Sequence, residues 1–329
     1  MRGSMRRPKG ATALRRNVAI FTLFFLIVAA LSGCQRLVEP EAASISVYAT
    51  FWPIYALTDA VMQDVPDADL RLLVQPQDGC LRDYQLSDWD AALLSAGADA
   101  VIMGGRGLES FESLLFAWGE SGPAVSAVLY NLELYNQDAR ADGESDSHLA
   151  GANPHLYMSI DGARRIVESI SATLQSLDPK YAGRYVESAK GADEALERLL
   201  ARNRAALAEY EGCSVVLMNE ALIYAALDYD LEVADWIDRE SGDPLAGNDL
   251  ALCLERLDAS GAQVILIEKQ APQALTEALE AAGYSVAKLD VLSTRREGDG
   301  FAAYIDLQSS NAQAIQSAFE RADGGKDTN

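Results

Sequence analysis

The chain has 329 residues, of which 27 are Lys or Arg and 49 are Asp or Glu, so its formal net charge is −22 at pH 7. A surface this acidic repels nucleic-acid phosphates, and we exclude DNA and RNA as partners. Hydrophobic residues make up 49% of the chain and aromatic residues 8%, ordinary values for a globular protein with room for two lobes of roughly 100–150 residues each. The two histidines, His148 and His155, limit both metal binding and acid–base chemistry.

The first 33 residues have the pattern of an export signal. Six basic residues and no acidic residue precede an apolar run at residues 18–31. A helix over that run would span about 21 Å, which is less than the ~30 Å hydrocarbon core of a bilayer. A basic start, a short apolar run and a small-residue site therefore predict a secretory signal rather than a spanning helix. The sequence Leu31-Ser32-Gly33-Cys34 resembles the bacterial lipobox, in which the cysteine is acylated and becomes residue one.

We therefore expect an extracytoplasmic protein that is lipid-anchored to the cell membrane through Cys34, with residues 1–33 removed and residues 34–43 serving as a tether. Removal of six positive charges gives a mature net charge of about −28 (−22 minus 6). Each buried acyl CH₂ contributes about 0.8 kcal/mol to membrane affinity, enough to hold a soluble domain at the bilayer. The alternative is a plain signal anchor in which Cys34 has no role.

Short apolar runs alternate with helical patterns in the first half of the mature chain. We predict strands at residues 44–50, 70–74, 100–103 and 124–129. A helix should begin at Phe51-Trp52-Pro53, with the proline in its first turn, and Ser87 should cap a helix at 88–95. This alternation is typical of βαβ units with a mostly parallel sheet.

An acidic surface loop at residues 136–153, which contains His148, separates this half from two helices. Asp161 is predicted to cap a helix at 162–177. The helical segment at 179–211 would span roughly 45 Å, long enough to bridge two lobes. The α/β pattern then restarts, with predicted strands at 214–218, 264–267 and 286–289 and predicted helices at 220–227, 273–282 and 302–322.

The fold class is therefore α/β, with two α/β lobes of mostly parallel sheets joined by a long helix. We place the N-terminal lobe at residues 44–178, the bridging helix at 179–211 and the C-terminal lobe at 212–326. Beyond Cys34 the chain contains Cys80, Cys213 and Cys253, without a C-x-x-C spacing that would indicate a zinc or redox motif. The sequence allows two alternatives for Cys213 and Cys253, namely a disulfide between them or two buried free thiols.

Four motifs, in order, resemble one family of binding proteins. ATFWPIY at 49–55 is similar to that family's T-T-F-Y-P-x-Y, and QPQDGCLRDYQLS at 75–87 is similar to its P-H-x-Y-E-P loop, written G-C-L-H-D-Y-Q-L in one branch. NPHLY at 153–157 resembles D-P-H-x-W. IEKQ at 267–270 and LDVL at 289–292 resemble F-x-E-x-Q and L-D-P-L. The chain therefore resembles the zinc/manganese-type metal solute-binding lipoproteins of bacterial ABC importers over about residues 44–322.

The resemblance implies two lobes joined by one rigid helix, with a divalent cation bound between them. Its four ligand positions fall on Arg82, His155, Asn219 and Asp290, where Asn219 lies in MNEAL in place of the family's F-H-E-A-F. Two of the four are substituted, which makes the chain a divergent member. A guanidinium has no lone pair to donate, and its charge repels a cation. Arg82 would instead pair with Asp290, and its charge would replace that of the metal.

The metal ligands expected from the resemblance are therefore His155 and Asp290, with Asn219, Glu220 and Glu268 less certain and Cys80 as a further candidate. Without the resemblance, His155 would be an ordinary polar loop residue and Asp290 the cap of a turn. One divalent ion, zinc or manganese, is the implied ligand, and the substitutions at Arg82 and Asn219 weaken the expectation that it binds tightly.

The function implied is that of an extracytoplasmic substrate-binding lipoprotein of a zinc/manganese-type ABC importer. It would capture its ligand between the lobes, as a monomer, and deliver it to a permease and its ATPase. No catalytic residue is expected, because the sequence has no G-x-S-x-G, no H-E-x-x-H and no phosphate-binding glycine loop. The alternative is a degenerate member that acts as an adhesin, sensor or accessory protein without tight metal binding.

The anchor prediction can be tested with one substitution. Cys34→Ala removes the only thiol that lipoprotein processing could acylate at this motif, so we expect loss of lipid labelling and release of the protein from the membrane. Labelled fatty acid is followed in cells that express either form. Incorporation that persists in Cys34→Ala would refute the lipoprotein interpretation.

Overall fold

The computed structural model describes residues 45–75, 81, 83–135, 152–237, 245, 247–292 and 299–326. The chain divides into two compact units, Met1–Ala42 and Ala43–Asn329, and every described residue belongs to the second. The predicted signal, Cys34, Cys80, Arg82 and His148 lie outside the described residues. Within the described part, no helix combines the length and the apolar character that a membrane crossing requires.

The N-terminal lobe is built on a parallel sheet with the strand order β2-β1-β3-β4. Its strands are β1 (Ile45–Ala49), β2 (Ala68–Leu72), β3 (Ala100–Met103) and β4 (Ala124–Ala127). All four residues of β3 are buried, as expected for a central strand that is covered on both faces. β2 begins two residues earlier than predicted, although Leu73 and Val74 continue to donate hydrogen bonds to the β1 segment.

The helices of this lobe are α2 (Trp52–Met62), α3 (Asp88–Gly97), α4 (Glu112–Ala117) and α5 (Ile160–Leu177). The predicted starts of α2 and α3 are confirmed, with Pro53 in the first turn of α2 and a capping box between Ser87 and Asp90. The predicted cap of α5 is wrong. Ser159 is the N-cap and accepts a hydrogen bond from the Gly162 amide. The helix starts two residues earlier than predicted, so that Asp161 lies within its first turn.

The C-terminal lobe repeats this strand order. Its parallel sheet has the order β6-β5-β7-β8, formed by β5 (Ser214–Leu217), β6 (Glu232–Trp236), β7 (Val264–Glu268) and β8 (Ser285–Leu289). In each lobe the second strand is added on one side of the first strand, and the third strand is added on the other side. The strand order therefore reverses between the first and third strands. Such a switch point leaves a crevice at the carboxyl ends of the strands, where open α/β sheets bind their ligands.

The helical elements of this lobe are α7 (Ile223–Asp228), α8 (Asn248–Ser260) and α9 (Gln273–Ala281), with a 3-10 turn, η7 (Glu220–Leu222), before α7. The sequence interpretation missed β6, α4 and α8.

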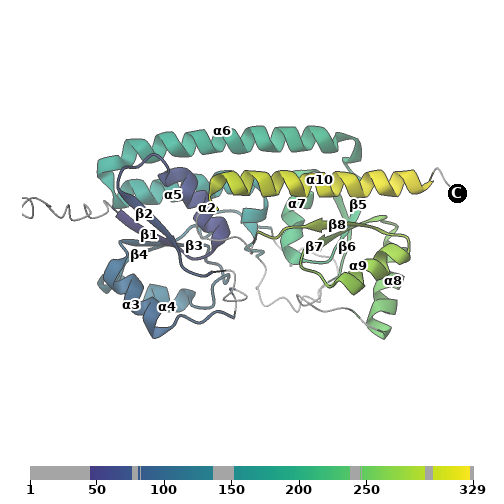
Figure 1. Cartoon of the computed structure of the whole chain (residues 1–329), viewed down its shortest axis with the longest axis horizontal. Coiled ribbons are helices and arrows are strands. Elements are labelled where there is room, and N and C mark those ends of the chain that lie inside the picture. The colour runs from purple at the N-terminus through teal and green to yellow at the C-terminus, as the bar shows by residue number, and fades with distance from the viewer. Residues whose placement is uncertain are drawn as a thin grey trace, which may run out of the picture. The chain divides into compact units, whose positions relative to one another are not determined.

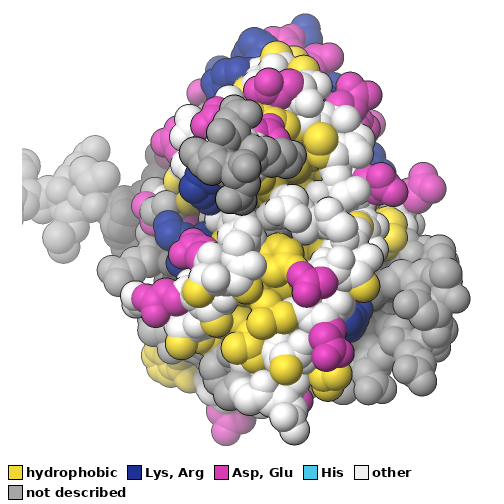
Figure 2. All heavy atoms as spheres, turned by 90° about the vertical axis from the view of Figure 1, so that its right-hand side faces the viewer, with side chains coloured by type: hydrophobic (Ala, Val, Ile, Leu, Met, Phe, Trp, Pro, Cys, Tyr) yellow, Lys and Arg dark blue, Asp and Glu magenta, His cyan; other side chains and the backbone are white. Residues whose placement is uncertain are grey.

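Figure 2 views the side on which α8 and α9 lie, where acidic side chains border an apolar area. Leu252 of α8 is 58% exposed. The acidic residues on this face agree with the negative net charge of the chain.

The long helix is confirmed as α6 (Ala182–Leu207), which is extended by 3-10 turns at Pro179–Tyr181 and Ala208–Tyr210 and spans about 39 Å over its α-helical part. A second long helix, α10 (Phe301–Lys326), runs beside it (Figure 1). Asn203 of α6 donates a hydrogen bond to the Gln308 carbonyl of α10. The single bridging helix is therefore accompanied by a second long helix that packs along it.

α10 contacts both lobes. At its start, the Phe301 amide donates a hydrogen bond to the Asp59 carboxylate of α2 in the N-terminal lobe. Near its other end, Arg321 donates to the Val286 carbonyl of β8. Tyr210 and Phe319 stack with their ring centroids 4.6 Å apart, which attaches the end of the bridging segment to α10.

One hydrophobic cluster runs through both lobes. It includes Val47 of β1, Leu196 of α6, Leu217 of β5 and Tyr304 of α10, all fully buried or nearly so. Two smaller clusters lie on the other faces of the sheets, one beneath α3 and α4 and one beneath α8 and α9. Each lobe is thus a helix–sheet–helix sandwich, and the inner helical layer is shared.

Cys213 and Cys253 are not joined by a disulfide. The disulfide alternative is therefore wrong for this pair. Cys253 is buried among the apolar residues beneath α8 and α9, and Cys213 packs at the edge of the shared cluster. Both act as small hydrophobic residues, the usual role of a free cysteine in a core.

A buried carboxylate joins two strand ends in the N-terminal lobe. Glu109 accepts hydrogen bonds from the Thr50 hydroxyl at 2.6 Å and from the amides of Gly104 and Gly105, each at 2.8 Å. Burial raises the pKa of Glu109 to about 7, although the three hydrogen bonds partly oppose this shift. Since Thr50 follows β1 and Gly104 follows β3, Glu109 fixes the switch point of this sheet.

This raised pKa predicts a pH dependence of stability. A carboxyl whose pKa is higher in the folded than in the unfolded protein stabilises the fold below its unfolded value near 4.5, and this contribution is lost as the pH rises through 7. Glu109 should therefore lower the free energy of unfolding by up to about 1.4 kcal/mol per pH unit in that window. Denaturant unfolding of Glu109→Gln should show a flatter profile, whereas the exposed Glu168→Gln serves as the control. Equal slopes in all three proteins would contradict the assignment.

Candidate functional site

Three of the predicted site residues lie at the carboxyl ends of strands in the C-terminal sheet. Asn219 follows β5, Glu268 ends β7, and Asp290 follows β8. Backbone hydrogen bonds from Met218 to Leu266 and from Lys269 to Leu289 keep these strand ends in register. Polar and acidic residues therefore lie at the carboxyl ends of these strands, where open α/β sheets bind their ligands.

His155 lies on the segment that connects β4 to α5, directly before the 3-10 turn η4 (Leu156–Met158). Although this segment belongs to the N-terminal half of the chain, side chains of the C-terminal half hold it. Tyr304 of α10 donates to the Tyr157 carbonyl at 2.7 Å, and Gln308 donates to the Met158 carbonyl at 3.0 Å. The segment that carries His155 thus lies at the boundary of the two lobes.

The structure brings His155 together with Glu220. The His155 Nε2 atom lies 3.8 Å from the Glu220 Oε1 atom, and the two side chains are 12% and 22% exposed. The other ring nitrogen, Nδ1, lies 2.8 Å from the Asn153 Oδ1 atom. An imidazole and a carboxylate from opposite lobes therefore approach each other, and both side chains are largely buried.

The remaining candidates have structural roles of their own. Asn219 is the N-cap of η7, and its side-chain oxygen accepts a hydrogen bond from the Ala221 amide at 2.9 Å. Asp290 is buried, and its carboxylate accepts a hydrogen bond from the amide of Leu292, a residue with a φ of +64°. This hydrogen bond is the one expected if Asp290 caps a turn. Glu268 is also buried, at 2% exposure.

The donor atoms of His155 and Glu220 are of the types that bind zinc or manganese, but they are few. Imidazole nitrogen and carboxylate oxygen are preferred ligands of both ions at about 2.0–2.2 Å. Two such ligands around a tetrahedral ion lie about 3.4 Å apart, close to the separation of His155 and Glu220. Among the described residues, however, no group of three or more His, Cys, Asp or Glu side chains could hold one ion.

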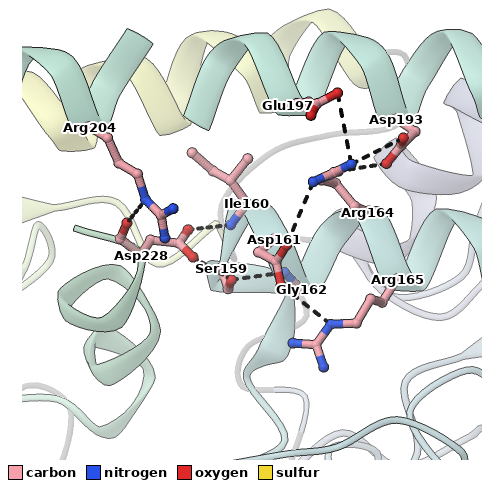
Figure 3. A network of polar contacts seen from close by, with 10 residues as sticks. All are labelled: Ser159, Ile160, Asp161, Gly162, Arg164, Arg165, Asp193, Glu197, Arg204 and Asp228. Carbon is pink, nitrogen blue, oxygen red and sulfur yellow. Dashed lines mark hydrogen bonds and ion pairs between the residues drawn. The ribbon is translucent and has the colours of Figure 1, made fainter. Parts of the chain in front are cut away.

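The structure adds a polar connection between the lobes that the sequence did not reveal (Figure 3). The buried carboxylate of Asp228 in α7 accepts hydrogen bonds from the Ser159 hydroxyl at 2.7 Å and from the Ile160 amide at 2.5 Å. Burial raises its pKa to about 6, while these hydrogen bonds and the nearby Arg204 oppose the shift. Asp228 thus completes the N-terminal cap of α5 from the opposite lobe.

Asn153 is the second residue of the site that the sequence interpretation did not single out. It is fully buried, and its amide nitrogen donates to the Glu220 carbonyl at 2.8 Å. The Tyr224 hydroxyl donates to the Asn153 carbonyl at 2.6 Å. The only sequence signal was its place two residues before His155, whereas its partners lie 67 and 71 positions away in the chain.

The two lobes and the long helices that run along both of them form the fold that this chain shares with solute-binding proteins. The chain matches the family model described as "ZnuA: Zinc-uptake complex component A periplasmic" over residues 47–318, and it belongs to this family. It is 23% identical over 308 residues to the high-affinity zinc uptake system protein ZnuA of Bacillus subtilis (strain 168), which covers 89% of this chain and 93% of that protein.

Solved structures share the fold. The SBP FpvC from Pseudomonas aeruginosa, in complex with Mn²⁺, superposes with a TM-score of 0.69 and 20% identity, over 84% of this chain and 99% of that chain. The Zn(II)-bound ZnuA-like domain of AdcA from Streptococcus pneumoniae gives a TM-score of 0.69 and 24% identity, over 83% and 98%. The predicted family and the predicted two-lobed fold are therefore confirmed.

The contribution of the Asp228 connection can be measured by comparing two serine caps. Ser87→Ala removes an exposed capping box and should cost about 1 kcal/mol of unfolding free energy. Ser159→Ala removes a cap and also leaves the buried Asp228 carboxylate without one of its donors, so we expect a loss of about 2–3 kcal/mol. Denaturant unfolding at neutral pH measures both. Equal losses would show that the Ser159–Asp228 contact adds nothing.

Proposed function

We propose that the protein is the extracytoplasmic solute-binding lipoprotein of an ABC importer that takes up a divalent transition-metal ion, zinc or manganese. The observation that carries this proposal is the 3.8 Å approach of the His155 Nε2 atom to the Glu220 carboxylate at the lobe boundary. Family membership and the similarity to proteins described with bound Mn²⁺ and Zn(II) support it. The family is one of transport proteins, and we assign no catalytic role to any residue.

We assign the first two ligands to His155 and Glu220. Asp290 and Glu268 are candidates for further donors. Glu268 ends β7, the strand next to β5, and Asp290 follows β8, the strand next to β7. Asn219 is the weaker candidate, since its side-chain oxygen is already engaged in capping η7. Arg82 falls at a position where the motif resemblance implies a ligand. It would reduce the affinity, because a guanidinium repels the cation and donates no lone pair.

The helical layer against which both sheets pack supports a capture mechanism with little lobe movement. A hinge motion would separate α6 and α10 from one of the sheets and expose part of the shared hydrophobic cluster. The ion would therefore enter a crevice that is largely formed beforehand, and ligand exchange would depend on local movements of the η7 and His155 segments. A permease with its ATPase would receive the ion, and the lipid on Cys34 would keep the monomeric protein at the membrane.

Titration calorimetry of the mature chain, residues 34–329 with Cys34 replaced by Ser, tests the proposal. We expect zinc or manganese to bind with one site per chain. His155→Gln and Glu220→Gln should each weaken binding at least about tenfold, because each removes one metal bond. Glu168→Gln, an exposed acidic residue on α5, is the matched control for the loss of negative charge. Binding that survives both site variants unchanged would refute the assigned ligands.

The shortage of donors favours one second candidate, an adhesin, sensor or accessory protein that does not carry a metal ion. The described residues contain no cluster of three donors. Absence of zinc and manganese binding in the same titrations, with a folded protein, would decide for this candidate and against the importer component.

A further inference from the structure

Asn153 occupies a position where every polar group of the residue is engaged. Its backbone amide donates to the Tyr135 carbonyl at 2.9 Å, and its backbone carbonyl accepts from the Tyr224 hydroxyl at 2.6 Å. Its side chain makes three further contacts, two with His155 and one with Glu220. It therefore touches both residues to which we assign metal ligation.

Two of these contacts determine which way the Asn153 amide points. The Glu220 backbone carbonyl can only accept a hydrogen bond, so the atom 2.8 Å from it must be the amide nitrogen, Nδ2. The His155 backbone N–H can only donate, so the atom 3.0 Å from it must be the oxygen, Oδ1. The orientation of the amide follows from two backbone partners and does not depend on the histidine ring.

This orientation fixes the proton on the His155 ring. Asn153 Oδ1 lies 2.8 Å from the ring nitrogen Nδ1 and has no proton to give. Nδ1 must therefore carry the proton and donate it. In the neutral imidazole the other nitrogen, Nε2, then holds the lone pair, and Nε2 is the atom that lies 3.8 Å from the Glu220 carboxylate.

From these contacts we infer that Asn153 is a positioning residue that presets the metal-binding tautomer of His155 and holds Glu220 beside it before any ion arrives. The inference rests on the proposed function, because it assumes that His155 and Glu220 receive the ion. A metal ligand must present a lone pair, and a partner on the other ring nitrogen fixes both the tautomer and the orientation of the ring.

The two halves of this role require different atoms of the amide. The oxygen serves His155, and a carboxylate at the same position would serve it equally. The nitrogen serves Glu220, and a carboxylate would instead place negative charge against the Glu220 carbonyl oxygen. Asn153→Asp should therefore preserve the tautomer but release Glu220, whereas Asn153→Ala should remove both effects.

The tautomer can be read directly by NMR of the mature chain labelled with ¹⁵N-histidine. Because the chain contains only His148 and His155, His148→Gln leaves one labelled ring. In the absence of metal, at a pH at which the ring is neutral, we expect a protonated Nδ1 and an unprotonated Nε2. Asn153→Asp should keep this signature, and Asn153→Ala should lose it. Asn203→Ala, which removes another buried asparagine that bonds a tyrosine and a carbonyl, should leave it unchanged.

Zinc titration of the same proteins gives the second measurement. We expect about 10–100-fold weaker binding in Asn153→Ala, the range known for loss of a residue that orients a metal ligand, and a smaller loss in Asn153→Asp. An Nε2-protonated ring in the unsubstituted protein overturns the inference, and this measurement needs no variant to fold. Unchanged ring signals in a folded Asn153→Ala also overturn it. The expected tautomer without any zinc or manganese binding would instead refute the proposed function and leave the control of the tautomer by Asn153 in place.

Discussion

Both sheets bury one face against the same layer of helices, and the rest of the structure depends on this shared apolar layer. Tyr304 of α10 and Leu196 of α6 are fully buried in a cluster that includes residues from strands of both lobes. Rotation of one lobe against the other would return part of this surface to water, at about 25 cal/mol for each Å² exposed. Two α/β sandwiches, each with the features of a separate domain, are in this way constrained to behave as one body.

The candidate site depends on that constraint. Its histidine belongs by sequence to the N-terminal half, yet Tyr304, Gln308 and Asp228 from the C-terminal half hold the segment around it through buried hydrogen bonds. Buried hydrogen bonds of this kind specify geometry strongly, because a broken one leaves an unsatisfied polar group away from water. A small donor pair such as His155 and Glu220 can be kept in place only if the two lobes from which it comes do not move apart.

Local signals in the sequence predicted most of the fold. Apolar runs located β1, β3, β5, β7 and β8 to within a residue or two, and Ser87 was correctly identified as a cap because its capping box is local. β6 was missed since it is an edge strand in which Glu232 and Asp235 interrupt the apolar pattern. The motif resemblance located His155, but Asn153 and Asp228 could not be recognised, because their roles arise from partners 67–71 positions away.

Asn219, where the motif resemblance places a ligand, has a structural role in the local fold. Asparagine is among the best N-cap residues, and here its side chain turns back to the Ala221 amide and begins η7. With position 219 engaged in this way, the next residue, Glu220, presents its carboxylate toward His155. Under the proposed function, the donor has moved by one residue and changed from nitrogen to anionic oxygen. Because carboxylate oxygen is a harder ligand than imidazole, this change would move the preference of the site from zinc toward manganese.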